Sequence, residues 1–471
     1  MRHAKIVCTI GPASRDIEVM RKLLDGGMDV ARINMAHGSH EDHAATIANI
    51  RQLESESGKP IAVLMDLAGP KLRIGDVENG EVIINEGDDF TVTTRPVMGT
   101  NEIVSINYPD LPRDVKAGDT ILIDEGLIIL EVLGVGEEDV RTRVIEGGPL
   151  NSKRGVHLPG VMVSLSPLSE KDRLDLAFGL EQGVDWIGLS FVRNSDDVKL
   201  LKSLVAEAIK HAKVIAKIEK QEAVKDIDNI LEVADGVMVA RGDLGIEMPT
   251  EMVPLVQKMI INKCMIVGKP VITATQMLDS MIRNPRPTRA EVSDVANAVL
   301  DGTDALMLSG ETAMGRFPVE SVSMMARTII AAERDLSFCI DRGAGPRERE
   351  RLSTTQAISK ATCEIASALR ATAIITSTQS GETARQVAKH HPAQPIIAIS
   401  PSDEVVRQLN LTWGVIPLKV GPSINLDNMF DIAVDAPLKA DLIEKGDRVV
   451  ITAGVFVNVP GTTNLIKVHR V

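Results

Sequence analysis

A lysine and two carboxylates follow short apolar segments in the middle of the chain, at spacings that could serve a metal ion and an anion. Lys217 and Glu219 end the apolar run 214–219, and the next such run is followed by Gly242 and Asp243. Because side chains alternate along a strand, Lys217 and Glu219 would point to the same side. Two carboxylates with room for substrate and water are a common Mg²⁺ site. A neighbouring ammonium group suits phosphoryl transfer, which depends on positioning and charge neutralisation.

Each of these patterns also has a plainer explanation. A Lys–Glu pair alone is most often a solvated or structural ion pair, and Asp after Gly is commonly a turn residue or a helix cap. Thr275, at the end of another apolar run, could simply cap the following helix. What favours a site is that polar residues end so many apolar runs, namely Arg32, Asn34, Asp66, Lys217, Glu219, Arg241, Asp243, Thr275, Ser309 and Glu311.

Eight buried strands would bring these polar residues together. Short runs rich in Val, Ile, Leu and Met alternate with segments of helical period, which predicts a parallel sheet covered on both faces. Eight such units predict a closed (β/α)8 TIM barrel, whose chemistry lies at the carboxyl ends of its strands. The predicted strands are Lys5–Ile10, Asp29–Asn34, Ile61–Asp66, Val184–Phe191, Lys213–Glu219, Gly236–Ala240, Pro270–Thr275 and Ala305–Ser309.

Two further domains are predicted from breaks in this alternation. The barrel occupies residues 1–69 and 167–340, and the short alternating segments of 70–166 indicate an inserted small β-barrel domain. An insertion after the third strand would lie over the active rim and could act as a lid. A stretch rich in Gly, Pro and charge after Asp341 reads as a linker. Residues 347–471 then resume an α/β pattern, which predicts an open C-terminal α/β domain.

The composition excludes several classes of protein. The net charge is −13 with no long basic tract, which disfavours nucleic acid as a partner. The four cysteines are far apart, so neither a zinc site nor a disulfide framework is expected. The first residues lack the apolar region of a signal peptide, and no uncharged apolar run reaches the length that a membrane span needs. We therefore expect a cytoplasmic protein with no membrane partner.

Several segments closely resemble the pyruvate kinase family. They are Lys5-Ile-Val-Cys-Thr-Ile-Gly-Pro, Ala31-Arg-Ile-Asn-Met-Ala-His-Gly, Asp66-Leu-Ala-Gly-Pro-Lys-Leu-Arg, Ala216-Lys-Ile-Glu, Met238-Val-Ala-Arg-Gly-Asp-Leu-Gly, Ile272-Thr-Ala-Thr-Gln-Met-Leu-Asp and Asn284-Pro-Arg-Pro-Thr-Arg-Ala-Glu. The resemblance spans essentially the whole chain. It implies transfer of the phosphoryl group of phosphoenolpyruvate to ADP, giving pyruvate and ATP, and a homotetramer.

The resemblance also implies roles for single residues. Glu219 and Asp243 would hold Mg²⁺ (or Mn²⁺), and Lys217 would stabilise the transferring phosphoryl group and the enolate. Arg32 and Arg73 would contact the phosphate. The N–H groups of Gly242 and Asp243, together with the Thr275 hydroxyl, would bind the substrate carboxylate. The implied nucleotide-binding residues are Asn34, His37, Arg73 and Arg154. Thr275 with a bound water is the suggested proton donor to the enolate.

Three positions depart from the pattern common in the family. Ala36, Leu67 and Lys71 stand where many members have the Ser, Thr and Glu associated with a K⁺ site. This combination resembles the K⁺-independent branch, in which a lysine charge near Asn34 and Asp66 stands in for the ion. We therefore expect a requirement for Mg²⁺ but not for K⁺.

A hydroxyl-rich loop in the last domain resembles the effector loop of the family. A strand, the loop and a helix start follow one another here, and free N–H groups at a helix start favour anions. Glu382 lies where relatives often carry Lys or Arg, and its charge should oppose a phosphate. A phosphorylated effector is expected, and its loop residues would be Thr376, Ser377, Thr378, Ser380, Gly381 and Thr383. An ordinary capped helix start is the alternative.

Two other functions remain open at this point. One is a metal-dependent lyase acting on phosphoenolpyruvate or pyruvate with the same carboxylate pair, which would need neither the lid nor Lys217. The other is a non-catalytic metabolite sensor that keeps only the effector domain. His37, His40 and His43 recur every three residues, but His40 and His43 are expected on a solvated helix face rather than in a metal site.

Overall fold

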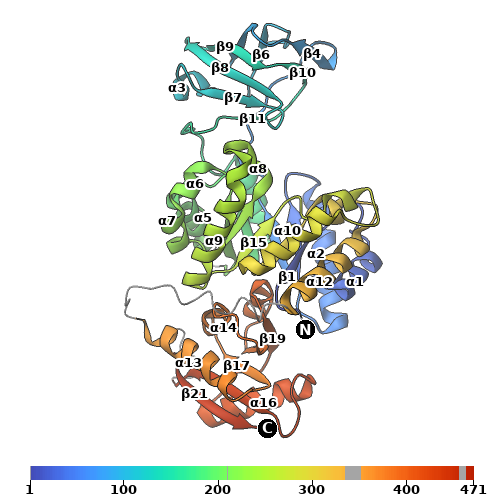
Figure 1. Ribbon diagram of the computed structural model, residues 1–471, viewed down its shortest axis with the longest axis vertical. Coiled ribbons are helices and arrows are strands. Elements are labelled where there is room, and N and C mark those ends of the chain that lie inside the picture. Colours follow the sequence, from blue (N-terminus) through green and yellow to red (C-terminus); the bar gives the residue numbers. More distant parts are fainter. Residues whose placement is uncertain (1, 209, 335–351, 456–462) are drawn as a thin grey trace.

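The computed structural model describes residues 2–208, 210–334, 352–455 and 463–471. Figure 1 shows three bodies in a row, with the barrel in the middle, the inserted domain beyond one end of it and the C-terminal domain beyond the other. The predicted linker after Asp341 lies outside the described residues. In the part of the chain that is described, no helix is both long and apolar enough to cross a membrane.

Eight parallel strands close into a barrel, as predicted, in the order β1-β16-β15-β14-β13-β12-β3-β2. Nearly all of their residues are buried, because helices cover the outer face and side chains fill the interior. The strands are β1 Lys5–Thr9, β2 Val30–Asn34, β3 Ala62–Asp66, β12 Trp186–Leu189, β13 Lys213–Ile218, β14 Gly236–Ala240, β15 Val271–Ala274 and β16 Ala305–Leu308.

The helices around the barrel begin where the sequence places capping residues. Ser39, Ser169 and Thr288 each form a capping box with the acidic residue three positions later. Left-handed glycines such as Gly27 and Gly268 end others. These helices are α1 Ile17–Gly26, α2 His40–Ser57, α4 Glu170–Glu181, α5 Ser195–Glu207, α6 Gln221–Lys225, α7 Ile227–Val233, α8 Arg241–Glu247, α9 Val253–Val267, α10 Arg289–Asp301, α11 Gly310–Ala313 and α12 Pro318–Arg334.

The inserted domain follows β3 and is built of β-strands around its own apolar core. Its strands form a six-stranded sheet, β11-β7-β8-β9-β5-β6, and a separate pair, β10-β4. Residues 72–75 join the two edges of the six-stranded sheet, because Ile74 bridges to Ile106 beside β6 and Arg73 bridges to Gly155 beside β11, so the sheet closes on itself in agreement with the predicted small β-barrel. The short helix α3 (Leu111–Asp114) packs beside it. The strands are β4 Glu81–Ile84, β5 Asp89–Thr93, β6 Ile103–Ser105, β7 Thr120–Ile123, β8 Ile128–Val135, β9 Asp139–Glu146, β10 Gly148–Asn151 and β11 Val156–His157.

The C-terminal domain is the predicted open α/β sheet, with strand order β19-β18-β17-β20-β21. The apolar runs 373–376, 395–399 and 448–452 predict three strands, and β17 (Ala373–Ser377), β18 (Ile396–Ser400) and β20 (Arg448–Gly454) lie there. Two edge strands were not predicted, because only one face of an edge strand is well covered and its apolar run is short. The remaining elements are α13 Thr354–Ala368, α14 Glu382–Ala388, α15 Asp403–Gln408, β19 Val415–Lys419, α16 Leu426–Lys439 and β21 Thr463–Arg470.

Candidate active site

A buried cluster of two cations and two carboxylates lies at the carboxyl ends of β2, β3 and β13. The Lys217 ammonium is 2.8 Å from Oε1 of Glu219 and 3.2 Å from Oδ1 of Asp66. The Arg32 guanidinium donates from Nε to Oδ2 of Asp66 at 2.7 Å, and a second nitrogen pairs with the same oxygen. Two positive and two negative groups therefore balance one another in a site that is almost closed to solvent.

The pKa shifts of this cluster show how its charges are kept. Burial by itself would lower the pKa of Lys217, but Asp66 and Glu219 outweigh it and raise that pKa. Burial would raise the pKa of Asp66, but Lys217 and Arg32 bring it below its usual value. The pKa of Glu219 is raised, first by burial and further by the charge of Asp243, against the lowering effect of Lys217. Lys217 therefore stays protonated at neutral pH, and Glu219 is the group most in need of a further positive charge.

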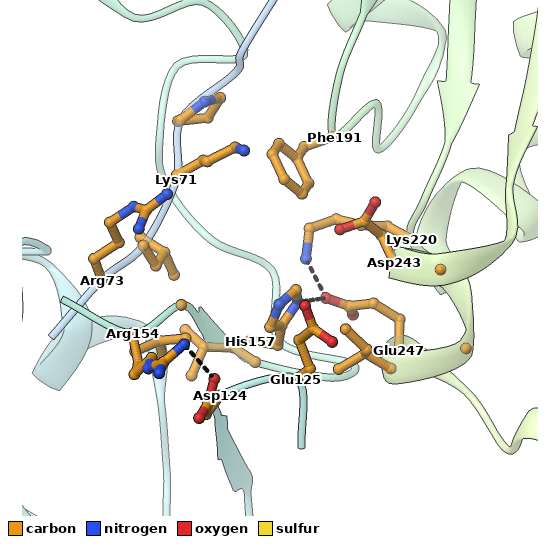
Figure 2. Close-up of a pocket in the computed structure, with 18 of the residues that line it drawn as sticks. Lys71, Arg73, Asp124, Glu125, Arg154, His157, Phe191, Lys220, Asp243 and Glu247 are labelled. Atoms are coloured by element: carbon orange, nitrogen blue, oxygen red, sulfur yellow. Dashed lines mark hydrogen bonds and ion pairs between the residues drawn. The ribbon is translucent and has the colours of Figure 1, made fainter. Parts of the chain in front are cut away.

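A cleft of about 840 Å³ opens beside this cluster, between the barrel rim and the inserted domain. Asp243, Thr275 and Phe191 line it from the barrel, and Lys71 and Arg154 line it from the inserted domain and the segments that lead to it. Figure 2 shows cationic side chains on both sides of this cleft. A cleft lined in this way suits a substrate that carries several negative charges.

Glu219 and Asp243 fit a divalent cation. They follow the adjacent barrel strands β13 and β14, and the charge of Asp243 raises the pKa of Glu219, a like-charge effect that a bound cation would reverse. Among the described residues, the Asp243 carboxylate has no hydrogen-bond or ion-pair partner, and it faces the cleft. No group of three or more His, Cys, Asp or Glu in the described ranges could hold a metal. Substrate or water would therefore have to complete the coordination.

Thr275 is held in a strained conformation at the cleft. Its φ is +70°, a region that β-branched residues rarely adopt. Arg241 stabilises this turn, because Nη2 donates to the Thr275 carbonyl at 2.6 Å and Nη1 pairs with Asp294. The Thr275 hydroxyl donates to the Ala274 carbonyl at 2.6 Å and accepts from the Gly242 N–H at 2.9 Å.

These bonds change two expectations about the site. Arg241 had been counted among the cations of the rim, but its guanidinium is directed at backbone carbonyls and Asp294. The Gly242 N–H and the Thr275 hydroxyl bind one another, so a substrate carboxylate would have to displace this bond to use both groups. The amide of Asp243, by contrast, lies in the first turn of α8, where N–H groups lack an intrahelical partner.

Ser190 and Phe191 belong to the site but were not singled out from the sequence. Ser190 Oγ is 2.6 Å from the Lys217 ammonium, and its hydroxyl donates to the Leu67 carbonyl. Phe191, with φ +55°, donates its N–H to Oε2 of Glu219 at 2.7 Å. The available signal was the position of Ser190 at the end of the fourth predicted strand, where the other strand ends carry polar residues.

The four predicted nucleotide residues do not all meet in the structure. Arg73 and Arg154 line the cleft, where Arg73 donates to the Lys153 carbonyl and Arg154 pairs with Asp124 at 3.4 Å. Asn34 ends β2 and His37 lies on the loop after it, and neither is among the residues that line the cleft. The Asn34 carbonyl oxygen Oδ1 accepts the Ala36 N–H, and His37 is exposed.

Lys71, whose charge is predicted to stand in for a cation near Asn34 and Asp66, has an exposed side chain that lines the cleft. Within the described chain it forms no hydrogen bond or ion pair with either residue. Asp66 is instead neutralised by Arg32 and Lys217. The physical reason is that Lys71 is carried by the segment that enters the inserted domain, so its distance from the rim depends on how that domain is oriented.

Other polar residues singled out above have structural partners. The Glu311 carboxylate accepts the N–H groups of Leu278 and Ser309. His40 is not simply solvated, because its Nε2 lies 2.8 Å from Asp175 and its ring stacks on Phe178. These residues organise loops and helices around the rim.

The predicted effector loop lies between β17 and α14, but several of its hydroxyl groups are already used or buried. Thr378 Oγ1 accepts the Gly381 N–H at 2.9 Å, and Thr383 Oγ1 bonds Thr463 at 2.7 Å. Thr376 is fully buried, whereas Ser377 and Ser380 are half-buried. Glu382 pairs with Arg385 at 3.0 Å, so its negative charge is partly neutralised within its own helix.

Known proteins resemble the whole chain. A family model described as "Pyruvate kinase, barrel domain" matches residues 1–322, and one described as "Pyruvate kinase, alpha/beta domain" matches residues 356–469. A pyruvate kinase of Geobacillus stearothermophilus is 49% identical over 99% of this chain and 80% of its own length. One of Clostridium acetobutylicum is 44% identical over the full length of both chains. The crystal structure of a pyruvate kinase from Cryptosporidium parvum has a TM-score of 0.94 and 38% identity, covering 100% of this chain and 96% of that one.

Proposed function

The chain belongs to the pyruvate kinase family and transfers the phosphoryl group of phosphoenolpyruvate to ADP, and we propose that the buried cluster around Lys217 and the adjoining cleft perform this reaction. The observation that supports this assignment is the Lys217 ammonium, which lies 2.8 Å from Glu219 at the barrel rim, beside a cleft lined by cations. An assay of pyruvate formation from phosphoenolpyruvate and ADP, coupled to lactate dehydrogenase, tests it. A lyase or a non-catalytic sensor would give no ADP-dependent signal.

In this proposal Lys217 and Arg32 neutralise the phosphoryl group during transfer. Both cations are almost buried and held in place by carboxylates, so little reorganisation is needed when charge moves. A divalent cation bound by Glu219 and Asp243 would supply charge neutralisation at the phosphate oxygens and a template for substrate. Thr275, with a bound water, is the proposed route for the proton to the enolate, and its strained backbone fixes where the hydroxyl points.

Arg73 and Arg154 are proposed to bind the nucleotide phosphates from the inserted domain, and Asn34 and His37 from the barrel. The first two already line the cleft, whereas the other two lie outside it. Movement of the inserted domain toward the barrel would bring the two pairs together around ADP and exclude water. A homotetramer is also expected from the family resemblance and stays a prediction.

We further propose that the reaction does not need K⁺. Ala36 removes a side-chain oxygen expected at a K⁺ site, Leu67 replaces the Thr common at its position, and Lys71 brings a positive charge to the same region of sequence. We expect the same rate in tetramethylammonium chloride as in KCl at equal ionic strength. Lys71→Glu should make the enzyme depend on K⁺, and strong activation of the unmodified enzyme by KCl would contradict the proposal.

The loop from Thr376 to Thr383 is proposed to bind the phosphate of an effector. Ser377 and Ser380 are its least buried hydroxyl residues, and Glu382 opposes an anion. We expect AMP, ribose 5-phosphate or fructose 1,6-bisphosphate to lower the phosphoenolpyruvate concentration needed for half-maximal rate. Ser380→Asp should abolish this response by like-charge repulsion, with the rate at saturating phosphoenolpyruvate unchanged. If none of the three compounds shifts the curve, the proposal is wrong.

A further inference from the structure

One buried barrel carboxylate contacts both a barrel lysine and a histidine of the inserted domain. Oε1 of Glu247 lies 2.9 Å from the Lys220 ammonium and 3.6 Å from Nδ1 of His157, and the Glu247 side chain is only 2% exposed. Figure 2 shows the three side chains meeting at one edge of the cleft. We call His157, Lys220 and Glu247 the lid joint.

The charge of Glu247 is maintained by its two partners. Burial would raise the pKa of this carboxyl, but His157 and Lys220 outweigh burial and lower it. The second carboxylate oxygen is buried and has no hydrogen-bond partner among the described residues. The side chain therefore depends on His157 and the Lys220 ammonium, and losing either would leave a poorly compensated buried charge.

On the side of the inserted domain, backbone hydrogen bonds connect His157 to the two arginines that line the cleft. His157 pairs with Leu122 in the antiparallel ladder of β11 and β7. Two residues earlier, Gly155 forms a bridge with Arg73, and the carbonyl of Arg154 accepts the Ile74 N–H. Arg73, Arg154 and His157 are therefore held in one hydrogen-bonded body, and fixing His157 fixes the other two.

On the barrel side, Lys220 and Glu247 lie close in sequence to the proposed metal ligands. Lys220 directly follows Glu219. Glu247 lies four residues after Asp243 in α8, so the two carboxylates share one side of that helix. The lid joint thus connects the two segments that carry the metal ligands to the two bridged segments that carry the arginines.

We propose that the lid joint positions Arg73 and Arg154 over the barrel rim for phosphoryl transfer to ADP. Glu247 is a positioning residue that acts through His157 and Lys220, without touching substrate. The inference rests on the proposed nucleotide role of the two arginines. It predicts that weakening the lid joint impairs use of ADP, which both domains bind, more than use of phosphoenolpyruvate, which the barrel binds.

The test is Glu247→Gln, which keeps the size of the side chain and removes its charge. We expect the KM for ADP to rise roughly tenfold, with the KM for phosphoenolpyruvate and kcat at saturating substrates close to those of the unmodified enzyme. Asp139→Asn is the matched control, because it removes a carboxylate that pairs with Arg95 at 2.7 Å on the exposed face of the same domain. It should change neither KM.

His157→Asn provides a second and milder variant, alone and in combination with Glu247→Gln. If the three residues act as one unit, His157→Asn should raise the KM for ADP by itself but add nothing in the Glu247→Gln background. Additive effects, or equal changes in both KM values, would overturn the inference. Activity of the unmodified enzyme in the coupled assay separates this failure from failure of the proposed function.

Discussion

Replacing Lys217 by Met should lower kcat by about 10²–10³-fold, the usual loss when one preorganised charge-stabilising group is removed from an active site. The KM for phosphoenolpyruvate should change much less, because the ammonium acts chiefly on charge that develops during transfer. Steady-state rates in the coupled assay, measured with both substrates varied, give the two constants. A near-normal kcat would show that Lys217 is not the group that stabilises the transition state.

The control for this variant is Lys213→Met on the same strand. Lys213 lies at the opposite end of β13 and pairs with Asp235 at 3.6 Å, far from the rim, so its loss should leave kcat unchanged. Lys217→Met also leaves Glu219 buried without its cation, which costs about 3–5 kcal/mol of stability when a buried pair is broken. Thermal unfolding must therefore be measured in parallel, and Lys217→Arg, which keeps the charge, should restore stability more than activity.

The second large effect is expected from Glu219→Gln. Removing this carboxylate should raise the Mg²⁺ concentration needed for half-maximal rate by at least about 100-fold, since even outer-shell changes at metal sites cost 10–100-fold. The amide also places an N–H₂ group or a neutral oxygen where Lys217 and the Phe191 N–H now find a charged acceptor. Mn²⁺ binding, followed by electron paramagnetic resonance of the free ion, measures the affinity without relying on turnover.

Glu222→Gln is a suitable control for the metal experiment. Glu222 lies in α6, three residues beyond Glu219, and is not among the residues that line the cleft. Its loss should leave Mn²⁺ affinity unchanged. Equal Mn²⁺ affinity for Glu219→Gln and the unmodified enzyme would place the divalent cation elsewhere and contradict the proposed pair of ligands.

Much of the fold follows from local patterns in the chain. All eight barrel strands lie where continuous apolar runs were found, because a strand buried on both faces must be apolar throughout. The cap of α2 at Ser39 reflects the same kind of local signal, because a Ser directly precedes a first turn that contains Glu41 and Asp42. The inserted small β-barrel was predicted from alternating segments, but alternation does not show that residues 72–75 bridge both edges of its six-stranded sheet.

The candidate site, too, was predicted from the sequence only in part. Spacing alone placed Lys217 and Glu219 on one side of a strand, and their 2.8 Å contact in the structure agrees with it. By contrast, only the tertiary structure turned Arg241 toward backbone carbonyls and brought the Phe191 N–H to Glu219. Such contacts depend on the exact approach of loops from different strands, which no short-range pattern encodes.

By itself, the sequence determined the barrel, the order of its strands along the chain and the polar residues at their ends, because hydrophobic periodicity and strand alternation are local properties. The tertiary structure alone decided which of those residues face the cleft, where Lys71 lies, and that His157 and Lys220 meet at Glu247. These three residues are far apart in sequence and belong to different domains. Their ion pairs exist only because packing of the two domains excludes water from one carboxylate, and burial of that kind is a property of the folded chain as a whole.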